Sequence, residues 1–216
     1  MVRAILSGTK TQTRRVCKPA VDAALSCVVG PFECPELDSW NFGDEDGDIQ
    51  FRCPYGQPGD RLWVRETWQG PLFNEDQLEA YQSNGSTFKT PEYCKYAADG
   101  GEPPEFFDAD DNLQRRWRPS IHMPRWASRI TLQINGVRVE RLQEISYEDA
   151  LAEGVSDLSA LLHEDWRPLE GESGDECARR LRWPQRLYKQ LWQSINGPGS
   201  WDTNPWVWCI SFRRID

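Results

Sequence analysis

Apolar and polar residues alternate most regularly between Ser128 and Leu142. Three aliphatic residues alternate with polar ones before the dipeptide Asn135-Gly136, and two valines alternate in the same way after it. Asn-Gly is the strongest short signal for a two-residue type I′ turn. The pattern therefore predicts a β-hairpin in this stretch, and the alternation over Trp206–Phe212 predicts a further strand.

Helical periodicity appears in three places along the chain. Val2–Leu6 is predicted as a short helix that ends near Gly8. A capping-box sequence predicts a second helix over Tyr147–Glu153, ended by the glycine that follows. The third helix is predicted over Leu181–Ile195, and Pro184 should lie in its first turn.

The remaining segments complete a mixed pattern of short elements. Further strands are predicted at Thr9–Val16, Ile49–Cys53, Arg61–Thr67 and Glu92–Ala97. Stretches without a period are predicted to be insertions, at about 19–48, 70–118 and 156–180, the last with a short helical piece at Leu158–His163. Short strands with a few helices between them predict one α+β domain over residues 1–216, built on a small mixed β-barrel.

Composition places the chain among folded proteins. Of its 216 residues, 38% are hydrophobic and 12% are aromatic, which argues against intrinsic disorder. No apolar run is long enough to span a membrane, and the first ten residues lack the apolar core of a secretory signal. We therefore expect a cytoplasmic protein, a monomer or weak dimer with no membrane partner.

Cysteine and histidine usage bears on metal binding. The seven cysteines are odd in number and contain no Cys-x-x-Cys pair, which favours free thiols. An alternative is a zinc site with irregular ligand spacing, formed by Cys17, Cys27, Cys34 and Cys53. With two histidines in the chain, a histidine-rich metal site is excluded. We expect no metal and no cofactor.

Charge is distributed unevenly about a net value of −9. Residues 1–18 carry five cations and no acid, and residues 115–141 carry seven arginines against one glutamate. An acidic total disfavours non-specific binding to duplex nucleic acid, because neutralisation of phosphates drives that binding. A local basic pocket for one nucleotide remains compatible with the sequence.

The segment 8–15 carries the densest candidate chemistry. Gly8 permits a sharp turn after the first helix, and Lys10, Thr13 and Arg15 follow within seven residues. Cations among hydroxyl groups are suited to hold an anion or a polar ring. The alternative from composition is an exposed basic loop.

The order of these residues is similar to the signature of the ASCH domain. That signature is a short helix followed by Gly-x-Lys-x-x-Thr-x-Arg, and other segments resemble the family in the same order. They are 58–64, 118–129, 130–145, 146–155, 194–202 and 206–215, which together cover roughly a third of the chain. The segments 118–129 and 194–202 resemble a phage-associated branch.

The resemblance implies a PUA-like mixed β-barrel with short helices and long loop insertions. It also implies a metal-independent amidohydrolase of N(4)-acetylcytidine or a related modified pyrimidine nucleoside or nucleotide. In that pattern Lys10 is the proton acceptor, Thr13 the nucleophile and Glu153 the proton donor. Other members of the family are described as modules that bind RNA or a modified base, or that cleave RNA, so RNA or single-stranded nucleic acid is the alternative partner.

Around these three residues we expect substrate-binding groups, namely Gly8, Arg15, Trp63, Glu66, Trp68 and Arg125. Gly8, Lys10, Thr13 and Glu153 should converge on one cavity. Because Lys10 and Thr13 are predicted on a loop and a strand start, their replacement by alanine should abolish hydrolysis and leave the fold intact.

The pKa of Lys10 decides whether this residue can serve catalysis or only binding. A free lysine has a pKa of about 10.4, so a general base near neutral pH needs that value lowered by about 3 units. Arg14 and Arg15 would lower it by repulsion, and Trp63 or Trp68 by excluding water. A charged Lys10 would instead hold an anion, which favours binding over hydrolysis.

Several residues keep two interpretations. Trp40, Trp68 and Trp201 are either core residues or platforms for a stacked base. Glu66 either reaches the pocket or forms an ion pair with Arg65 or Arg129. His122 is either a packed structural residue or a catalytic one.

Overall fold

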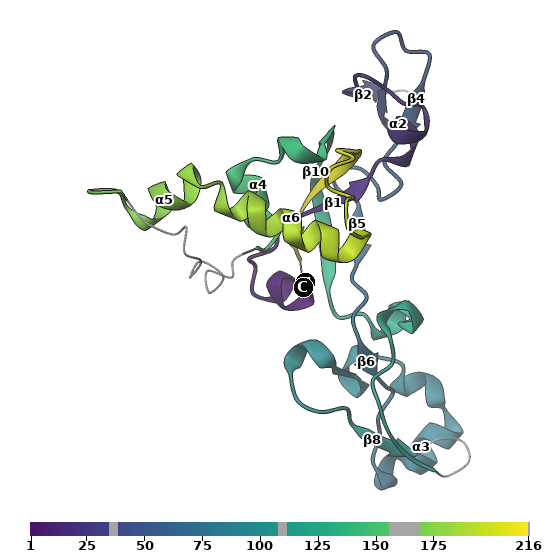
Figure 1. The fold of residues 1–216 in the computed structure, drawn as a ribbon. Helices are drawn as coiled ribbons and strands as arrows, with labels where there is room; N and C mark the ends of the chain where they lie inside the picture. Colours follow the sequence, from purple (N-terminus) through teal and green to yellow (C-terminus); the bar gives the residue numbers. More distant parts are fainter. Residues whose placement is uncertain (35–38, 108–111, 156–168, 216) are drawn as a thin grey trace. The chain divides into compact units, whose positions relative to one another are not determined.

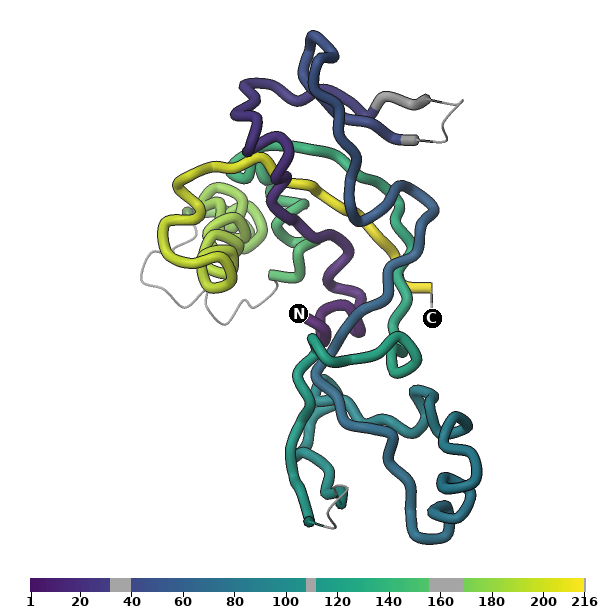
Figure 2. Tube along the Cα trace, turned by 90° about the vertical axis from the view of Figure 1, so that its right-hand side faces the viewer, coloured from purple at the N-terminus to yellow at the C-terminus, as the bar shows by residue number. Residues whose placement is uncertain are grey.

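The computed structural model describes residues 1–34, 39–107, 112–155 and 169–215. The chain forms two compact units. The first unit contains Met1, Arg3–Asp60 and Gln133–Arg213, and the second contains Val2, Arg61–Leu132 and the C-terminal end. Figure 2 traces the chain as it leaves the first unit after Asp60 and returns near Gln133. The predicted insertion at 70–118 lies wholly in the second unit.

The fold is mixed α+β, with a curled antiparallel sheet and short helices (Figure 1). Its main sheet has the order β1-β11-β10-β5. These strands are β1 (Gln12–Val16), β11 (Trp206–Arg214), β10 (Thr131–Arg141) and β5 (Arg61–Trp63). Strand β1 pairs antiparallel with β11, so that Thr13 lies opposite Ile210 and Arg14 opposite Cys209.

The described residues of the first unit contain five α-helices. They are α1 (Val2–Leu6), α2 (Lys18–Asp22), α4 (Tyr147–Ala152), α5 (Gly174–Arg180) and α6 (Trp183–Asn196). Of these, α4 and α6 pack against this sheet, and α5 packs against α4 and α6. The core places Tyr188 and Trp192 of α6 against Val207 and Cys209 of β11, with Ala150 of α4 beside them. Side chains from both faces of β11 are buried, because Val207 and Cys209 pack against α4 and α6 while Trp208 packs against two phenylalanine rings.

The predicted helices at Val2–Leu6 and Tyr147–Glu153 are confirmed within one residue. The Ser146 side chain accepts a hydrogen bond from Asp149 N at 3.0 Å, and Glu153 is the C-terminal cap residue of α4. The predicted helix at 181–195 begins two residues later, with Pro184 in its first turn as expected. The helical piece predicted at Leu158–His163 lies outside the described residues.

The predicted β-hairpin at Ser128–Leu142 is wrong. β10 runs without interruption through Asn135-Gly136, because its neighbours in the sheet are β11 and β5. Gly59 N donates to Ile134 O at 2.8 Å, and Ile134 N donates to Asp60 O at 2.9 Å. The alternation of buried residues is interrupted at the dipeptide, between Ile134 and Val137, and that interruption imitates the pattern of a turn.

The prediction of an irregular insertion at 19–48 is also wrong in part. This stretch contributes most of α2 and two strands, β2 (Val29–Cys34) and β3 (Ser39–Gly43), which form a small antiparallel sheet with β4 (Gln50–Arg52). Phe42 and Phe51 of that sheet meet the Trp208 ring edge-on, at centroid distances of 5.0 and 5.7 Å. Burial of these aromatic faces anchors the small sheet to β11.

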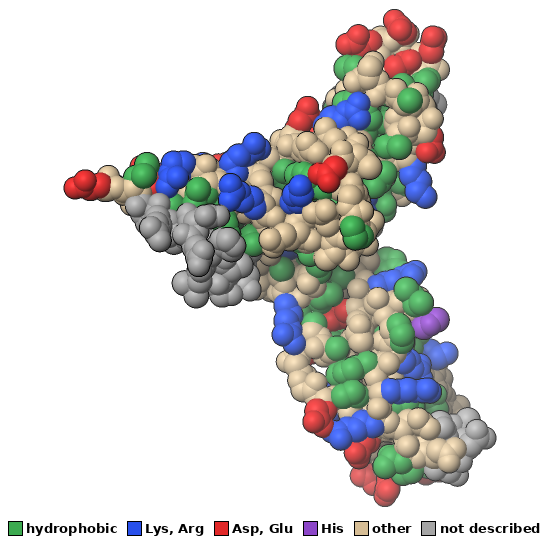
Figure 3. All heavy atoms as spheres, in the orientation of Figure 1, with side chains coloured by type: hydrophobic (Ala, Val, Ile, Leu, Met, Phe, Trp, Pro, Cys, Tyr) green, Lys and Arg blue, Asp and Glu red, His purple; other side chains and the backbone are tan. Residues whose placement is uncertain are grey.

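The second unit is built from short ladders and turns. Its elements are β5, β6 (Trp68–Gln69), α3 (Leu78–Ser83), β7 (Lys95–Tyr96), β8 (Glu105–Phe107), β9 (Leu113–Arg115) and several 3₁₀ turns. Trp68, Tyr96, Met123 and Ala127 form its buried core. Figure 3 shows several Lys and Arg side chains, in blue, gathered on one face of this unit.

Candidate functional site

Lys10 is held inside the first unit by the turn that follows α1. Gly8 adopts a φ of +76°, and the Lys10 backbone N–H donates to Ala4 O at 2.9 Å. Lys10 is 5% exposed. Its Nζ donates to Glu153 Oε2 at 2.6 Å and to the Glu153 carbonyl oxygen at 2.9 Å. Lys10 is therefore a buried residue, which corrects the expectation that its replacement would leave the fold intact.

Glu153 lies beside Lys10 because α4 ends next to the segment that carries the lysine. Thr11 N donates to Ala152 O at 2.8 Å, which brings the end of α4 against the segment before β1. Gly154 then turns the chain with a φ of +83°. A Cβ at that position would lie 3.0 Å from the Lys10 Cβ, so glycine permits the close approach.

Arg14 joins Glu153 to a wider set of buried polar groups. Its NH1 donates to Glu153 Oε1 at 3.2 Å and to Gln12 Oε1 at 2.6 Å. Its NH2 donates to Glu140 Oε1 at 2.6 Å and to Asp149 Oδ2 at 3.1 Å. Arg14 is 1% exposed, so nearly all of its donors are satisfied by protein groups.

The network is electrically balanced, and it runs from the buried Lys10 and Arg14 to Arg138, whose side chain is 41% exposed. Arg138 completes it by donating to Asp149 Oδ2 at 2.5 Å and to Glu140 Oε2 at 3.0 Å. Three cations face three carboxylates, namely Lys10, Arg14 and Arg138 with Glu140, Asp149 and Glu153. Buried charges are stable when they are paired and hydrogen-bonded in this way.

The environment of Lys10 lowers its pKa from the usual 10.5. Burial is the largest cause, since it disfavours the charged ammonium group. Glu153 opposes the shift by attraction and by its hydrogen bond, while Arg15 and Arg14 add to it by repulsion. The net direction is the one that a proton acceptor needs.

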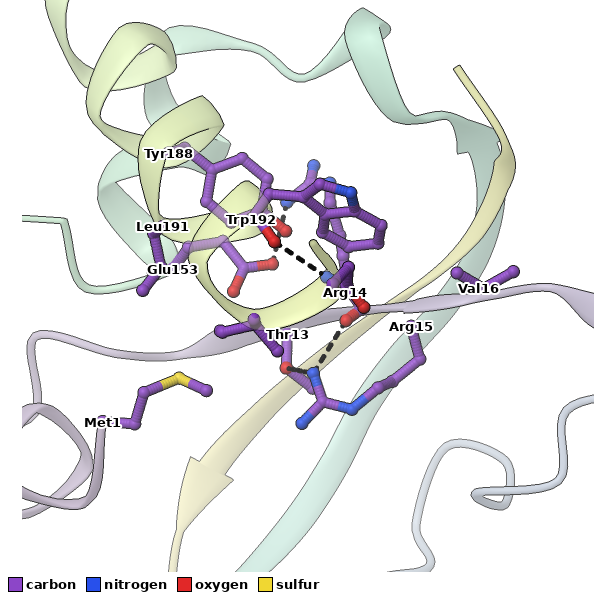
Figure 4. Close-up of a pocket in the computed structure, with 11 residues that line it drawn as sticks. Met1, Thr13, Arg14, Arg15, Val16, Glu153, Tyr188, Leu191 and Trp192 are labelled. Atoms are coloured by element: carbon purple, nitrogen blue, oxygen red, sulfur yellow. Dashed lines mark hydrogen bonds and ion pairs between the residues drawn. The ribbon is translucent and has the colours of Figure 1, made fainter. Parts of the chain in front are cut away.

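A cavity of about 250 Å³ lies beside the network, between α6 and β1 (Figure 4). It is lined by Met1, Thr13, Arg14, Arg15, Val16, Glu153, Tyr188, Leu191, Trp192, Ile195 and Asn196. Glu153 belongs to the wall, whereas Lys10 and Gly8 do not. Lys10 thus lies behind Glu153 and is linked to the cavity through that carboxylate.

The side chains of Thr13 and Lys10 form hydrogen bonds with different residues. The side chains of Lys10 and Arg14 meet at Glu153, whereas Thr13 Oγ1 accepts a hydrogen bond from Arg15 NH1 at 2.9 Å. Figure 4 shows the Thr13 hydroxyl turned toward the Arg15 guanidinium. The structure therefore brings Thr13, Arg15 and Glu153 to one cavity and places Lys10 one group away from it.

The other predicted binding residues belong to the second unit, and each has its partners there. Trp63 is half-buried, with the Arg65 and Arg125 guanidinium carbons 4.8 and 5.7 Å from its ring centroid. Trp68 is 1% exposed and packs edge-on against Trp126, as a core residue does.

Glu66 forms a buried ion pair with Arg129. Arg129 Nε and NH2 donate to the two Glu66 oxygens at 3.0 Å each, and Arg129 also binds Asp99. Of the two interpretations of Glu66, the ion pair is the one present. His122 is exposed, and Trp40 and Trp201 are half-buried.

The cysteines offer little to a metal ion. Cys17, Cys27 and Cys53 are free thiols, and the Cys34 side chain is not among those that the structure describes. Throughout the described ranges, no group of three or more His, Cys, Asp or Glu residues is arranged to hold a metal ion. None of the helices described is long and apolar enough to cross a membrane.

Sequence reasoning missed several residues of the site. Glu140, Asp149 and Arg138 join the network, and Tyr188 forms part of the cavity wall. The spacing of Arg138 and Glu140 by two residues could have indicated that they act together, because it places both on one face of a strand. Tyr188 lies one helical turn before Trp192, so both share a face of α6.

Comparison of the chain with protein-family models, with curated proteins and with solved structures found no match.

Proposed function

We propose that the chain is an amidohydrolase of N(4)-acylated cytidine or a related modified pyrimidine nucleoside or nucleotide, on a PUA-like barrel of the ASCH type. The observation that carries the proposal is the contact of Glu153, a residue of the cavity wall, with the buried Lys10 at 2.6 Å. A carboxylate backed by a lysine of lowered pKa is equipped to move protons at a cavity.

Thr13 would supply the nucleophile. Because its hydroxyl oxygen accepts from Arg15, the hydroxyl proton stays available for transfer. Its oxygen would attack the acyl carbonyl carbon while the proton passes through Glu153 toward Lys10. The C–N bond then breaks, the amine of the pyrimidine takes up a proton from Glu153, and water hydrolyses the acyl-threonine ester to a carboxylic acid.

The other residues of the wall suit a planar polar ring. Tyr188 and Trp192 present aromatic side chains from α6, and Arg15 places an exposed guanidinium beside Thr13. A guanidinium at that position would stabilise the negative charge on the carbonyl oxygen as the tetrahedral intermediate forms.

The second candidate is a module that binds a modified base without chemistry. It is favoured by the separate hydrogen bonds of Thr13 and Lys10, because a threonine without a base in contact is a poor nucleophile. In this case the balanced network is a rigid wall and Lys10 serves only to support Glu153.

Mass spectrometry of the purified protein with a panel of N(4)-acylcytidines separates the two candidates. We expect release of the free pyrimidine by the parent protein and none by Thr13→Ala, whose half-exposed site predicts an unchanged fold. Thr13→Val is the matched control for shape, and Thr13→Ser should retain turnover. Binding with no turnover in the parent would establish the second candidate instead.

A further inference from the structure

A second cavity of about 650 Å³ lies next to the first in the same unit. It is lined by Val16, Ala20, Val21, Ala24, Leu25, Arg141, Trp192, Asn196, Ser200, Thr203, Pro205 and Trp206. Val16, Trp192 and Asn196 line both cavities, so the two share one wall. We call these two adjoining cavities the groove, with Glu153 and Thr13 in the first cavity and Arg141 and Trp206 in the second.

Arg141 places a positive charge in the second cavity. Its NH2 donates to Leu25 O at 3.2 Å, its NH1 lies 3.4 Å from Asn204 O, and its guanidinium carbon is 4.2 Å from the Trp206 ring centroid. Trp206 Nε1 donates to the same Leu25 carbonyl at 2.8 Å, which fixes the ring and the guanidinium together. No carboxylate within the described ranges pairs with the Arg141 guanidinium.

Arg15 is the corresponding arginine without a described carboxylate partner in the first cavity. Its NH1 donates to Thr13 Oγ1 and to the Arg14 carbonyl oxygen, at 2.9 and 2.8 Å. Among the described side chains, no carboxylate forms an ion pair with Arg15. The contrast with the buried network is sharp, since there every cation has a carboxylate partner. Each cavity is therefore lined by one arginine that has no carboxylate partner among the described residues.

We propose that the groove binds its substrate as one nucleotide within a single strand, with the modified pyrimidine in the first cavity and the adjoining nucleotide in the second. This rests on the proposed function of the first cavity. A free nucleoside would leave the larger cavity empty and Arg141 without an anion. A phosphodiester would supply that anion, and the neighbouring base would lie against Trp206 and the aliphatic residues of α2.

The size and lining of the second cavity fit a nucleotide. Ligand cavities commonly measure about 300–1,000 Å³ and combine apolar walls with a few polar groups. Ser200, Thr203 and Asn196 supply polar side chains beside Arg141 and Trp206. Stacking of a base on an aromatic ring and an arginine contact with phosphate are the two general means of holding a single strand.

Titration calorimetry with two unreactive probes tests the proposal on the full chain. The probes are cytidine and the dinucleotide cytidylyl-(3′→5′)-cytidine. We expect the dinucleotide to bind about tenfold or more tightly than cytidine, since a hydrogen bond to a charged group contributes at least that factor. Arg141→Gln should reduce the difference to about threefold or less, and Arg141→Lys should retain part of it.

Arg186→Gln is the matched control. Arg186 is an exposed arginine of α6 that lines neither cavity, so this variant should keep the full preference for the dinucleotide. Thermal unfolding of each variant shows whether the fold is retained. Raised salt should weaken dinucleotide binding more than cytidine binding, because only the dinucleotide carries a phosphate.

The outcomes separate this proposal from the proposed function. Equal affinity for the two probes would overturn the second subsite and leave the first cavity as a nucleoside site. A preference for the dinucleotide that persists in folded Arg141→Gln would also overturn it. Binding of neither probe would overturn the pyrimidine site and the second subsite together.

Discussion

Lys10 Nζ donates both of its hydrogen bonds, at 2.6 and 2.9 Å, to one residue, Glu153. One bond goes to the side chain and one to the backbone, and both groups sit at the C-terminal cap of α4. The lysine therefore fixes the end of a helix and neutralises a carboxylate of the cavity wall at the same time. The stability of the fold and the proposed chemistry therefore depend on the same contact.

Lys10→Met should destabilise the protein strongly. Removal of one partner of a buried ion pair commonly costs about 3–5 kcal/mol, because the other charge remains buried without compensation. Arg14 still contacts Glu153 at 3.2 Å, which places the expected loss in the free energy of unfolding near the lower end. Urea denaturation measures it.

The control for that variant is Lys189→Met. The side chain of Lys189 is 43% exposed and its Nζ lies 3.4 Å from Asp202 Oδ1, and surface pairs contribute at most about 1 kcal/mol. Equal losses in the two variants would show that the burial of Lys10 has no energetic consequence.

Lys10→Arg should lose hydrolysis while it keeps a positive charge. Arginine cannot accept a proton at physiological pH, and loss of a general base commonly costs about 10²–10⁴-fold in rate. In the parent, kcat should rise with pH through the pKa of Lys10, which burial lowers from 10.5, and level off above it. Near-normal turnover in folded Lys10→Arg would exclude the proton-acceptor role.

Asp149→Asn should flatten the loss of stability in acid. Burial raises the pKa of Asp149, but Arg138, the Gln12 hydrogen bond and Arg14 together hold it below its usual 3.8. The folded state therefore keeps this carboxylate ionised where the unfolded chain protonates it. Its contribution is fully present above pH 3.8 and is lost as the pH falls through the lower folded value.

Unfolding measured across the acid range checks this expectation. The exposed Asp175→Asn removes the same charge from the first turn of α5 and serves as the control. If both variants follow the parent curve in parallel, Asp149 has no part in the acid dependence.

Gly154→Ala should destabilise more than Gly199→Ala. Both glycines have a positive φ, of +83° and +79°, so both variants carry a backbone cost of about 1–2 kcal/mol. At Gly154 the added Cβ also lies 3.0 Å from the Lys10 Cβ and 3.1 Å from that of Ala4, while at Gly199 it meets nothing within 4 Å. Equal unfolding midpoints would show that the segment carrying Lys10 moves away from the added Cβ at no cost in stability.

Much of the fold could be read from local signals, and the failures have identifiable causes. The capping residues of α4 lie within a few positions of each other, so the sequence shows them directly. At Asn135-Gly136 the local signal was present, but the sheet partners of β10 decided the outcome. Pairing between strands distant in sequence is not encoded in any one segment.

The candidate site was found in part for the same reason. Gly8, Lys10 and Thr13 are close in sequence, and the helix pattern placed Glu153 correctly at the end of α4. The inward role of Arg14 was hidden, because an alternating polar strand normally presents its charged residues to solvent. Its burial becomes clear only when Glu140 and Asp149 are brought beside it.

The hydrogen bonds that join Gly59 and Asp60 to Ile134 have a consequence for how sequence length can vary. They hold together the two points at which the chain leaves the first unit and re-enters it. β5 and the start of β10 belong to the main sheet, so the part that can vary is the stretch between them, residues 64–130. That stretch can be shortened, exchanged or enlarged while the frame around Lys10 and Glu153 keeps its own connections.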